Sequence, residues 1–229
     1  MNPSITGISS MATRQLLVEL AADYTRHSGR LLDLESVGGL DAARRVMAGE
    51  VFDVVVLASE AIDKLIASGH LMAGSKVDLV RSPVAIAVRA GAPQPDVSSE
   101  AAVRHAVLAA RSLSYSTGPS GVFLAQLFER WGIAQDIASR LVQAPPGVPV
   151  GTLVARGEVE LGFQQLSELM HLDGISVIGT LPRAIEFITT FSAALCPGSA
   201  QPEAAREMLH FMSSPGAAAA KRRQGMEPA

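Results

Sequence analysis

Serine, threonine and glycine gather in four short turns, each placed where a β-rich run gives way to an amphipathic stretch. The turns are residues 9–11, 36–39, 116–121 and 145–151. The first N–H groups of a helix have no partner within the helix, and the positive end of the helix dipole lies beside them. With neighbouring hydroxyls, they replace the water shell of a small anion, and each charge-assisted hydrogen bond contributes about 1.5–3 kcal/mol. Each turn alone is more typical of an ordinary N-cap, but the four together, two in each half of the fold, indicate an anion site as well as they indicate N-caps.

The elements around these turns alternate between strand and helix. Residues 53–58 form an apolar run that is typical of a buried strand. Leu16, Leu17, Leu20 and Tyr24 have the spacing of one helix face. A series of this kind predicts an α/β fold with mostly parallel sheets, in which the carboxyl ends of the strands form the ligand crevice.

The same patterns divide the chain into two lobes. The expected strands are residues 4–8, 31–35, 53–58, 113–116, 141–144 and 159–163. The expected helices are residues 12–27, 40–48, 60–68, 99–110, 121–131, 149–156, 166–170, 202–212 and 214–223. Two longer extended segments, residues 77–88 and 184–195, bracket the middle block. We interpret them as hinge strands that join lobe 1, residues 1–82 plus 190–229, to lobe 2, residues 83–189.

Composition excludes several classes of function. Over 229 residues the net charge is −3, with 48% hydrophobic and 18% charged residues, which is typical of a globular protein and gives no broad basic surface for nucleic acid. No apolar run reaches the length of a membrane span. The five histidines lack metal-binding spacing, so we expect no metal and no cofactor. The single cysteine, Cys196, is expected to be a buried, unreactive thiol.

An ordered set of motifs resembles the type II periplasmic-binding-protein fold over nearly the whole chain. The motifs are Ile8-Ser9-Ser10-Met11, Ser36-Val37-Gly38-Gly39, Gly49-Glu50-Val51-Phe52-Asp53-Val54, Lys64-Leu65 with Gly69-His70-Leu71, Gly118-Pro119-Ser120-Gly121, Gly157-Glu158-Val159-Glu160-Leu161-Gly162-Phe163, Ser213-Ser214-Pro215-Gly216-Ala217-Ala218 and Gly225-Met226-Glu227-Pro228. The likeness is greatest to the molybdate-binding proteins of ABC importers and their relatives. It implies a two-lobed fold that closes about its hinge on a small anion.

The resemblance also implies which residues touch the ligand. By matched position they are Ser9, Ser10, Ser36, Gly38, Gly39, Gly118, Ser120, Gly121, Val148, Val150 and Gln165. Two departures weaken the case for a tetrahedral oxyanion, because Gln165 stands where these binders have a tyrosine and Val37 where they have a second serine. Arg81 is the cation that we expect near the cleft, where its planar guanidinium suits a carboxylate, although a hinge arginine paired elsewhere explains it equally well. Gln164 and Gln165 could orient a carboxylate, or one of them faces the core edge of a helix.

Two functions remain open on this evidence. The first is a solute-binding protein that captures a molybdate-like oxyanion or a di- or tricarboxylate, with an ABC permease as partner if the protein is exported. The second is an isomerase similar to the aconitate isomerases among these relatives, which move a double bond in a tricarboxylate. Glu35, Glu168 and Tyr115 lie near the turns, but we interpret both glutamates as solvated or cap-region acids. Residues 1–8 lack a secretory signal, so we expect a cytoplasmic protein, or a periplasmic one whose signal was removed.

Overall fold

The computed structural model describes residues 4–145 and 147–229, and the chain divides into two units. Unit 1 consists of Met1–Arg81 and Thr190–Ala229, and unit 2 is Ser82–Thr189. The chain passes between the units within two strands, β4 (Val77–Arg89) and β8 (Ile188–Leu195). Each unit has its own buried cores, so each is described by itself.

Unit 1 is built around three parallel strands. These are β1 (Ile5–Ser10), β2 (Leu32–Val37) and β3 (Val54–Ala58), in the order β2-β1-β3. Strand β8 joins β3 in the antiparallel direction, and the short β9 (Glu227–Pro228) pairs with β4. Because β1 lies between its two parallel neighbours, all three strands end at the same edge of the sheet.

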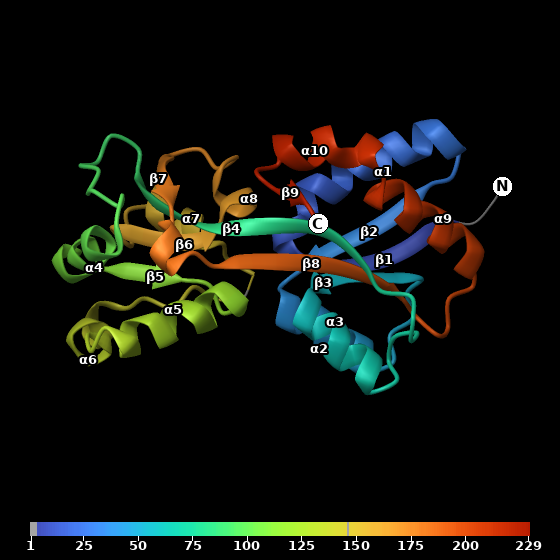
Figure 1. The fold of residues 1–229 in the computed structure, drawn as a ribbon, viewed down its shortest axis with the longest axis horizontal. Coiled ribbons are helices and arrows are strands. Elements are labelled where there is room, and N and C mark those ends of the chain that lie inside the picture. The colour runs from blue at the N-terminus through green and yellow to red at the C-terminus, as the bar shows by residue number, and fades with distance from the viewer. Residues whose placement is uncertain (1–3, 146) are drawn as a thin grey trace. The chain divides into compact units, whose positions relative to one another are not determined.

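Helices cover both faces of this sheet (Figure 1). Helices α1 (Arg14–Ser28), α9 (Pro202–Ser213) and α10 (Ala218–Arg223) pack on one face. Helices α2 (Gly39–Met47) and α3 (Ser59–Ala67) pack on the other. Consecutive side chains of a strand point to opposite faces, which is why β3 is apolar throughout.

Unit 2 has the strand order β7-β4-β6-β5. Strands β5 (Leu113–Tyr115) and β6 (Leu161–Gln165) are parallel, whereas β4 and β7 (Ile175–Thr180) add antiparallel pairs. Helices α4 (Glu100–Ala109), α5 (Pro119–Arg130) and α6 (Ala134–Ile137) share the largest core with these strands. Two smaller cores hold the remaining helices of this unit. Helix α7 (Val150–Ala155) packs with Val159, and α8 (Leu166–Leu169) packs with Ala85 and Ala87 of β4. The described residues also contain four short 3-10 helices: Met11–Thr13, Ala138–Arg140, Arg183–Ile185 and Pro215–Ala217.

Some sequence-based element predictions were wrong. The strand expected over residues 141–144 reduces to one isolated bridge between Leu141 and Leu113, because the segment is largely exposed and runs into Pro145, which has no N–H. The patterns also missed α6 and β7. The helix expected over residues 214–223 is a 3-10 turn followed by α10, since Pro215 and Gly216 interrupt it. The remaining expected elements are present, with ends shifted by a few residues.

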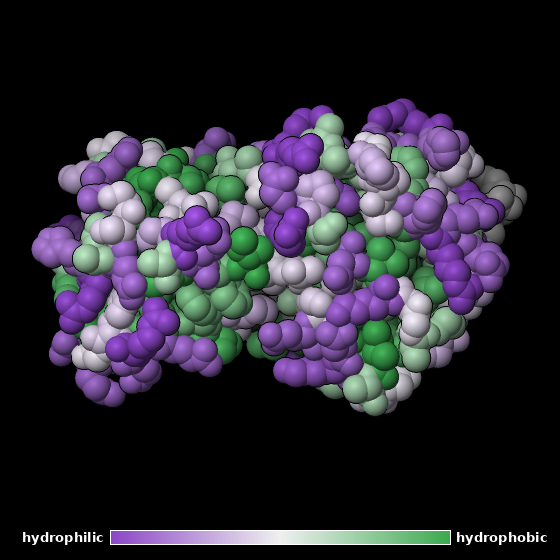
Figure 2. All heavy atoms as spheres, in the orientation of Figure 1, coloured by the Kyte–Doolittle hydropathy of each residue, from purple (hydrophilic) through white to green (hydrophobic). Residues whose placement is uncertain are grey.

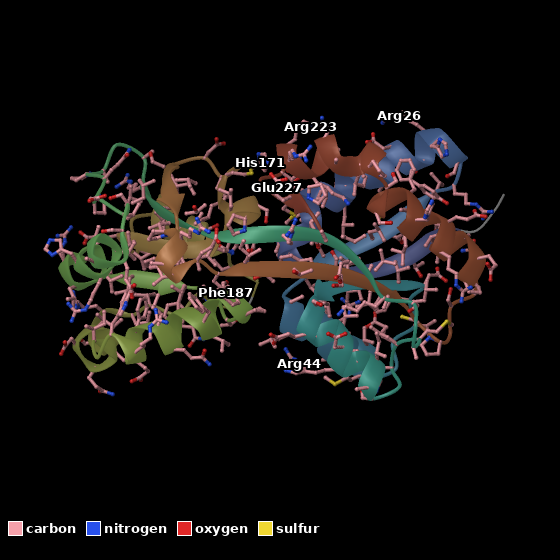
Figure 3. All side chains as sticks on the ribbon, viewed as in Figure 1. Arg26, Arg44, His171, Phe187, Arg223 and Glu227 are labelled. Carbon is pink, nitrogen blue, oxygen red and sulfur yellow. The ribbon has the colours of Figure 1, made fainter. Side chains whose placement is uncertain are left out.

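Hydrophilic residues are spread over the view in Figure 2, with hydrophobic residues in scattered patches. Two residues labelled in Figure 3 belong to ion pairs. Arg223 pairs with Glu19, and Glu227 pairs with Arg222 at 3.2 Å. Within the described residues, no helix combines the length and apolarity needed to cross a membrane.

A buried carboxylate ties the first strand of unit 1 to the segment after β8. Asp53 accepts hydrogen bonds from the Thr6 backbone N–H (2.8 Å), the Thr6 hydroxyl (3.1 Å) and the Ser199 hydroxyl (2.6 Å). Burial raises the pKa of Asp53, but these hydrogen bonds outweigh burial, so its pKa is below the usual value. The charged form of Asp53 therefore stabilises the fold.

We expect Asp53→Asn to lower the free energy of unfolding at pH 7 by about 1–3 kcal/mol, because it removes the charge from three hydrogen bonds. A carboxylate whose pKa is lower in the folded protein stabilises the fold at pH values above its unfolded-state pKa. This stabilisation is lost as the pH falls through its folded-state pKa. The wild-type advantage over Asp53→Asn should therefore shrink between pH 5 and pH 3 in urea unfolding. Asp33→Asn, on the exposed side of β2, is the control and should change little. An equal loss at both pH values would contradict this role.

Candidate functional site

The turns of unit 1 gather at the carboxyl edge of its parallel strands. Ser9 on β1 is level with Ser36 on β2 and with Val56 on β3. The turns that follow these strands, which begin α2 and α3, therefore lie on either side of the turn after Ser10. Two of the turns were expected from the sequence, and the structure brings them together.

Hydrogen bonding separates the serines at this edge. The Ser9 and Ser36 hydroxyls bond to each other at 2.7 Å, and Ser9 also donates to the Glu35 carbonyl at 3.3 Å. The Ser10 side chain is 7% exposed, and its hydroxyl has no partner among the described residues. Gly39 lies close by, since a Cβ at that position would be 3.7 Å from Ser10 Cβ. Ser10 is thus the hydroxyl with unused bonding capacity, whereas Ser9 and Ser36 are engaged with each other.

Two helices start at this edge. Gly38 precedes the first residue of α2, Gly39, with its carbonyl accepting the Ala42 N–H. The start of α3, Ala58 followed by Ser59, is a junction that our sequence analysis missed. A serine placed directly after a buried apolar strand was the signal that could have found it.

The turns of unit 2 gather in the same way. Strands β5 and β6 are parallel, with Tyr115 level with Phe163. Residues 116–121 follow the end of β5, and Gln165 is the last residue of the neighbouring β6. Gly118 precedes α5, and the Ser116 and Ser120 hydroxyls are 2.9 Å apart. Burial raises the pKa of Tyr115, which keeps its phenol protonated.

Gly121 lets the turn fold back over the start of α5. A Cβ at this position would lie 1.5 Å from the Ser116 carbonyl oxygen, closer than any real contact. The close approach of backbone to backbone therefore requires glycine.

Val148, Val150 and Arg81 have different surroundings. Val150 is the first residue of α7, and its side chain is buried with Leu153 and Val154, so it can offer a ligand only its backbone. Val148 is partly buried, and Pro146 of this turn lies outside the described residues. Arg81 is exposed and donates to the Pro228 carbonyl at 3.0 Å, so its role in binding stays a prediction.

Gln164 and Gln165 are both buried at the end of β6, and neither lies on a helix, which corrects the sequence interpretation. The Gln164 side chain accepts from the Gly151 N–H at 3.2 Å and donates to Glu168 Oε1 at 2.8 Å. The Gln165 Nε2–H donates to the Thr189 hydroxyl at 2.7 Å, and Oε1 of Gln165 has no partner among the described residues. Because a hydroxyl can also donate, turning this amide over would keep the Thr189 contact and present an N–H instead of the oxygen.

Glu168 lies in the first turn of α8, as expected for a cap-region acid, but it is not solvated. It is partly buried at the beginning of α8, and burial raises its pKa to about 7, against a smaller lowering by the Gln164 amide. Glu35 does behave as expected, since it is exposed and pairs with Arg45, with both oxygens at 2.8 Å. Those hydrogen bonds lower the pKa of Glu35. Glu168 is thus the acid near a strand end that can change its protonation state near neutral pH, a property set by burial that the sequence did not reveal.

The described residues offer no group of three or more metal-ligating side chains. Cys196 is buried, and burial raises its pKa to about 11, so the thiol is protonated and unreactive at neutral pH.

We expect Gly121→Ala to destabilise the protein by about 2 kcal/mol or more, because the new methyl group displaces the Ser116 carbonyl. Gly118→Ala is the matched control: its φ is −78° and the nearest atom to a new Cβ is 3.8 Å away, so the change should be small. Thermal unfolding of both variants checks the difference, and equal melting temperatures would contradict the geometry.

We expect Glu168→Gln to be more stable than wild type at pH 8 by about 1–3 kcal/mol and nearly equal to it at pH 4. A carboxyl whose folded-state pKa is raised binds its proton more tightly in the folded protein, so its contribution falls as pH rises from about 4.5 through about 7. Glu35→Gln should show no such gain, since the pKa of Glu35 is lowered. Urea unfolding across this range measures the effect, and a pH-independent difference would argue against a buried acid.

Comparisons with known proteins agree with this architecture. The profile of the bacterial extracellular solute-binding protein family matches residues 5–227. An aconitate isomerase from Pseudomonas sp. is 38% identical over 231 residues, covering 98% of this chain and 88% of that protein. Among solved structures, the periplasmic molybdate-binding protein of Azotobacter vinelandii has a TM-score of 0.81 at 19% identity, covering 97% of this chain and 98% of the other. The sulfate-binding protein of Mycobacterium tuberculosis has a TM-score of 0.80 at 16% identity, covering 100% of this chain and 88% of the other.

The two solved structures share the type II periplasmic-binding-protein fold with this chain, as the motifs indicated. The family match covers almost the whole sequence, and the strand and helix order agrees with it. The chain belongs to the bacterial extracellular solute-binding protein family.

Proposed function

We propose that this protein is an isomerase that moves the double bond of a small tricarboxylate, with aconitate as the substrate. The observation that carries the proposal is Glu168, a partly buried carboxyl near a strand end with a pKa of about 7. The 38% identity with an aconitate isomerase supports the same reaction. The sequence patterns had favoured simple solute binding, and the state of Glu168 reverses that order.

Groups that suit an anion line the strand ends. The free hydroxyl of Ser10 and the starts of α2 and α5 supply hydrogen-bond donors without fixed positive charge. Gln165 has an unpartnered buried Oε1, and with its amide turned over, the Thr189 contact is kept and an N–H is presented to a carboxylate where oxyanion binders have a phenol. These groups support recognition of carboxylates.

A carboxylate three residues after Gln165 is unfavourable in a protein that only binds anions. Charged Glu168 repels an anionic ligand, and no cation is among the causes that set its pKa. Proton transfer needs a group that can hold or release a proton near neutral pH, and Glu168 meets that requirement.

Glu168 alone can carry out both proton transfers of the reaction. Charged Glu168 takes a proton from the methylene carbon next to the double bond, and the C–H electron pair forms a new double bond while the old pair shifts to the far carbon. Protonated Glu168 then returns the proton to that far carbon. One C–H bond breaks and one forms, so the step is redox-neutral and consumes no co-reactant.

Binding of a small anion without catalysis is the second candidate function. It is favoured by the fold shared with molybdate- and sulfate-binding proteins. Four expectations from the sequence stay predictions: the closure of the two lobes, the ligand contacts that the resemblance implies, an ABC permease as partner, and the cellular location.

The test is to incubate the purified protein with trans-aconitate in D₂O and follow the double bond by ¹H NMR. We expect conversion to the cis isomer, with deuterium entering at carbon to the extent that the carboxyl proton of Glu168 exchanges with solvent before it is returned. Glu168→Gln should lower kcat at least about 100-fold, while the dissociation constant stays equal or improves because a repelling charge is gone. Glu35→Gln is the control and should retain wild-type turnover.

A thermal-shift panel separates the two candidates. At a ligand concentration about a hundred times the dissociation constant, binding stabilises the fold by about 2.7 kcal/mol. We expect aconitate to raise the melting temperature and molybdate and sulfate to leave it unchanged. Stabilisation by molybdate without any response to tricarboxylates would sink the isomerase proposal.

A further inference from the structure

The Gln164 side chain bridges a helix start and a carboxyl group. It is 4% exposed, accepts from the Gly151 N–H and donates to Glu168 Oε1. A backbone N–H can only donate, so the amide atom facing Gly151 must be Oε1 of Gln164. The NH₂ group is then directed to Glu168, and this direction holds whatever the protonation state of the carboxyl.

Few titratable side chains lie on the elements packed against Glu168. Helix α8 packs against β6 and β7, and neither strand carries a titratable side chain. Helix α7 carries none either, and the charged residue of β4 in unit 2, Arg89, lies at the end of the strand level with Ile175. On the segment after α8 are His171 and Asp173. Burial and the Gln164 amide are the two causes that set the pKa of Glu168.

An N–H donor makes the two oxygens of Glu168 unequal. Oε1 accepts from Gln164 in both protonation states, because a protonated carboxyl keeps a carbonyl oxygen that can accept. The proton is therefore held on Oε2. An amide achieves this orientation without adding a charge, whereas an arginine in its place would hold the carboxyl permanently ionised.

We propose that Gln164 is a positioning residue that fixes Glu168 through Oε1 and leaves Oε2 as the atom that takes and returns the substrate proton. The inference rests on the proposed isomerase function for its chemistry, but the contact itself exists in the ligand-free protein. Gln164 acts through Glu168 and need not touch the substrate.

The test uses two variants. Gln164→Met keeps the length of the side chain and removes both hydrogen bonds. Gln164→Glu keeps an acceptor for Gly151 and removes the N–H donor. In Gln164→Met the pKa of Glu168 should rise by about one unit, because a contact that favours the carboxylate is lost. In Gln164→Glu it should rise further, because a second carboxyl is added beside Glu168. Gln126→Met, on the exposed face of α5, is the matched control and should leave that pKa unchanged.

The first readout needs no substrate. Carboxyl ¹³C NMR titration of the ligand-free protein, with the Glu168 resonance assigned by its loss in Glu168→Gln, should show the upward shift in both folded variants. No shift in a variant that unfolds cooperatively like wild type would overturn the proposal, even if wild type isomerises aconitate.

The second readout is the pH profile of kcat/KM. The acid limb of this profile should move to higher pH with the pKa of Glu168, so that kcat/KM at pH 7 falls by about fivefold with KM nearly unchanged. A fall in kcat/KM that is uniform across pH, or carried by KM, would overturn the positioning role. If wild type shows no turnover while the titration shifts as expected, the proposed function fails and the Gln164–Glu168 contact stands.

Discussion

Parallel strand pairing is the constraint on which the candidate site depends. In unit 1, β1 is hydrogen-bonded between β2 and β3, and in unit 2, β5 is hydrogen-bonded to β6. Parallel neighbours must end at the same edge, so residues separated by about 25 or more positions in the chain come together there. The polar turns are local features of the sequence, but only this pairing makes each group of them a single surface.

Within that surface, hydrogen bonding sorts structural groups from available ones. Ser9 and Ser36 satisfy each other, and Ser116 and Ser120 do the same. Ser10 and one amide atom of Gln165 are buried without a partner among the described residues. A buried polar group without a partner costs about 1–3 kcal/mol, so a ligand that hydrogen-bonded these two groups would recover that cost.

Glu168 shows the same trade between stability and function. Holding a carboxyl in a weakly polar environment raises its pKa and destabilises the folded protein at alkaline pH. A neighbouring arginine would remove that destabilisation and with it the ability to exchange a proton near pH 7. The neutral amide of Gln164 differs from an arginine in this respect. It hydrogen-bonds to the Glu168 carboxyl, and the carboxyl can still gain or lose its proton.

Much of this organisation was predictable from the sequence because it arises from short-range patterns. The apolar run at residues 54–57 and the spacing of Leu16, Leu17 and Leu20 reflect burial on one or both faces of a regular element. Glycine and serine after strands mark turns through their backbone preferences. The order of these motifs indicated the family, which the comparison confirmed.

Tertiary structure decided what depends on groups distant in the chain. Residues 141–144 have a strand-like sequence but meet β5 at one residue, and β7 forms where the local pattern gave no signal. Nothing local distinguishes Ser10 from Ser9, since the difference is the partner on β2. Glu168 has the sequence of an ordinary helix-start acid, and its protonation is set by the surrounding apolar atoms and by an amide from β6. Sequence patterns specify elements through neighbours along the chain, whereas desolvation and hydrogen-bond satisfaction depend on neighbours in space.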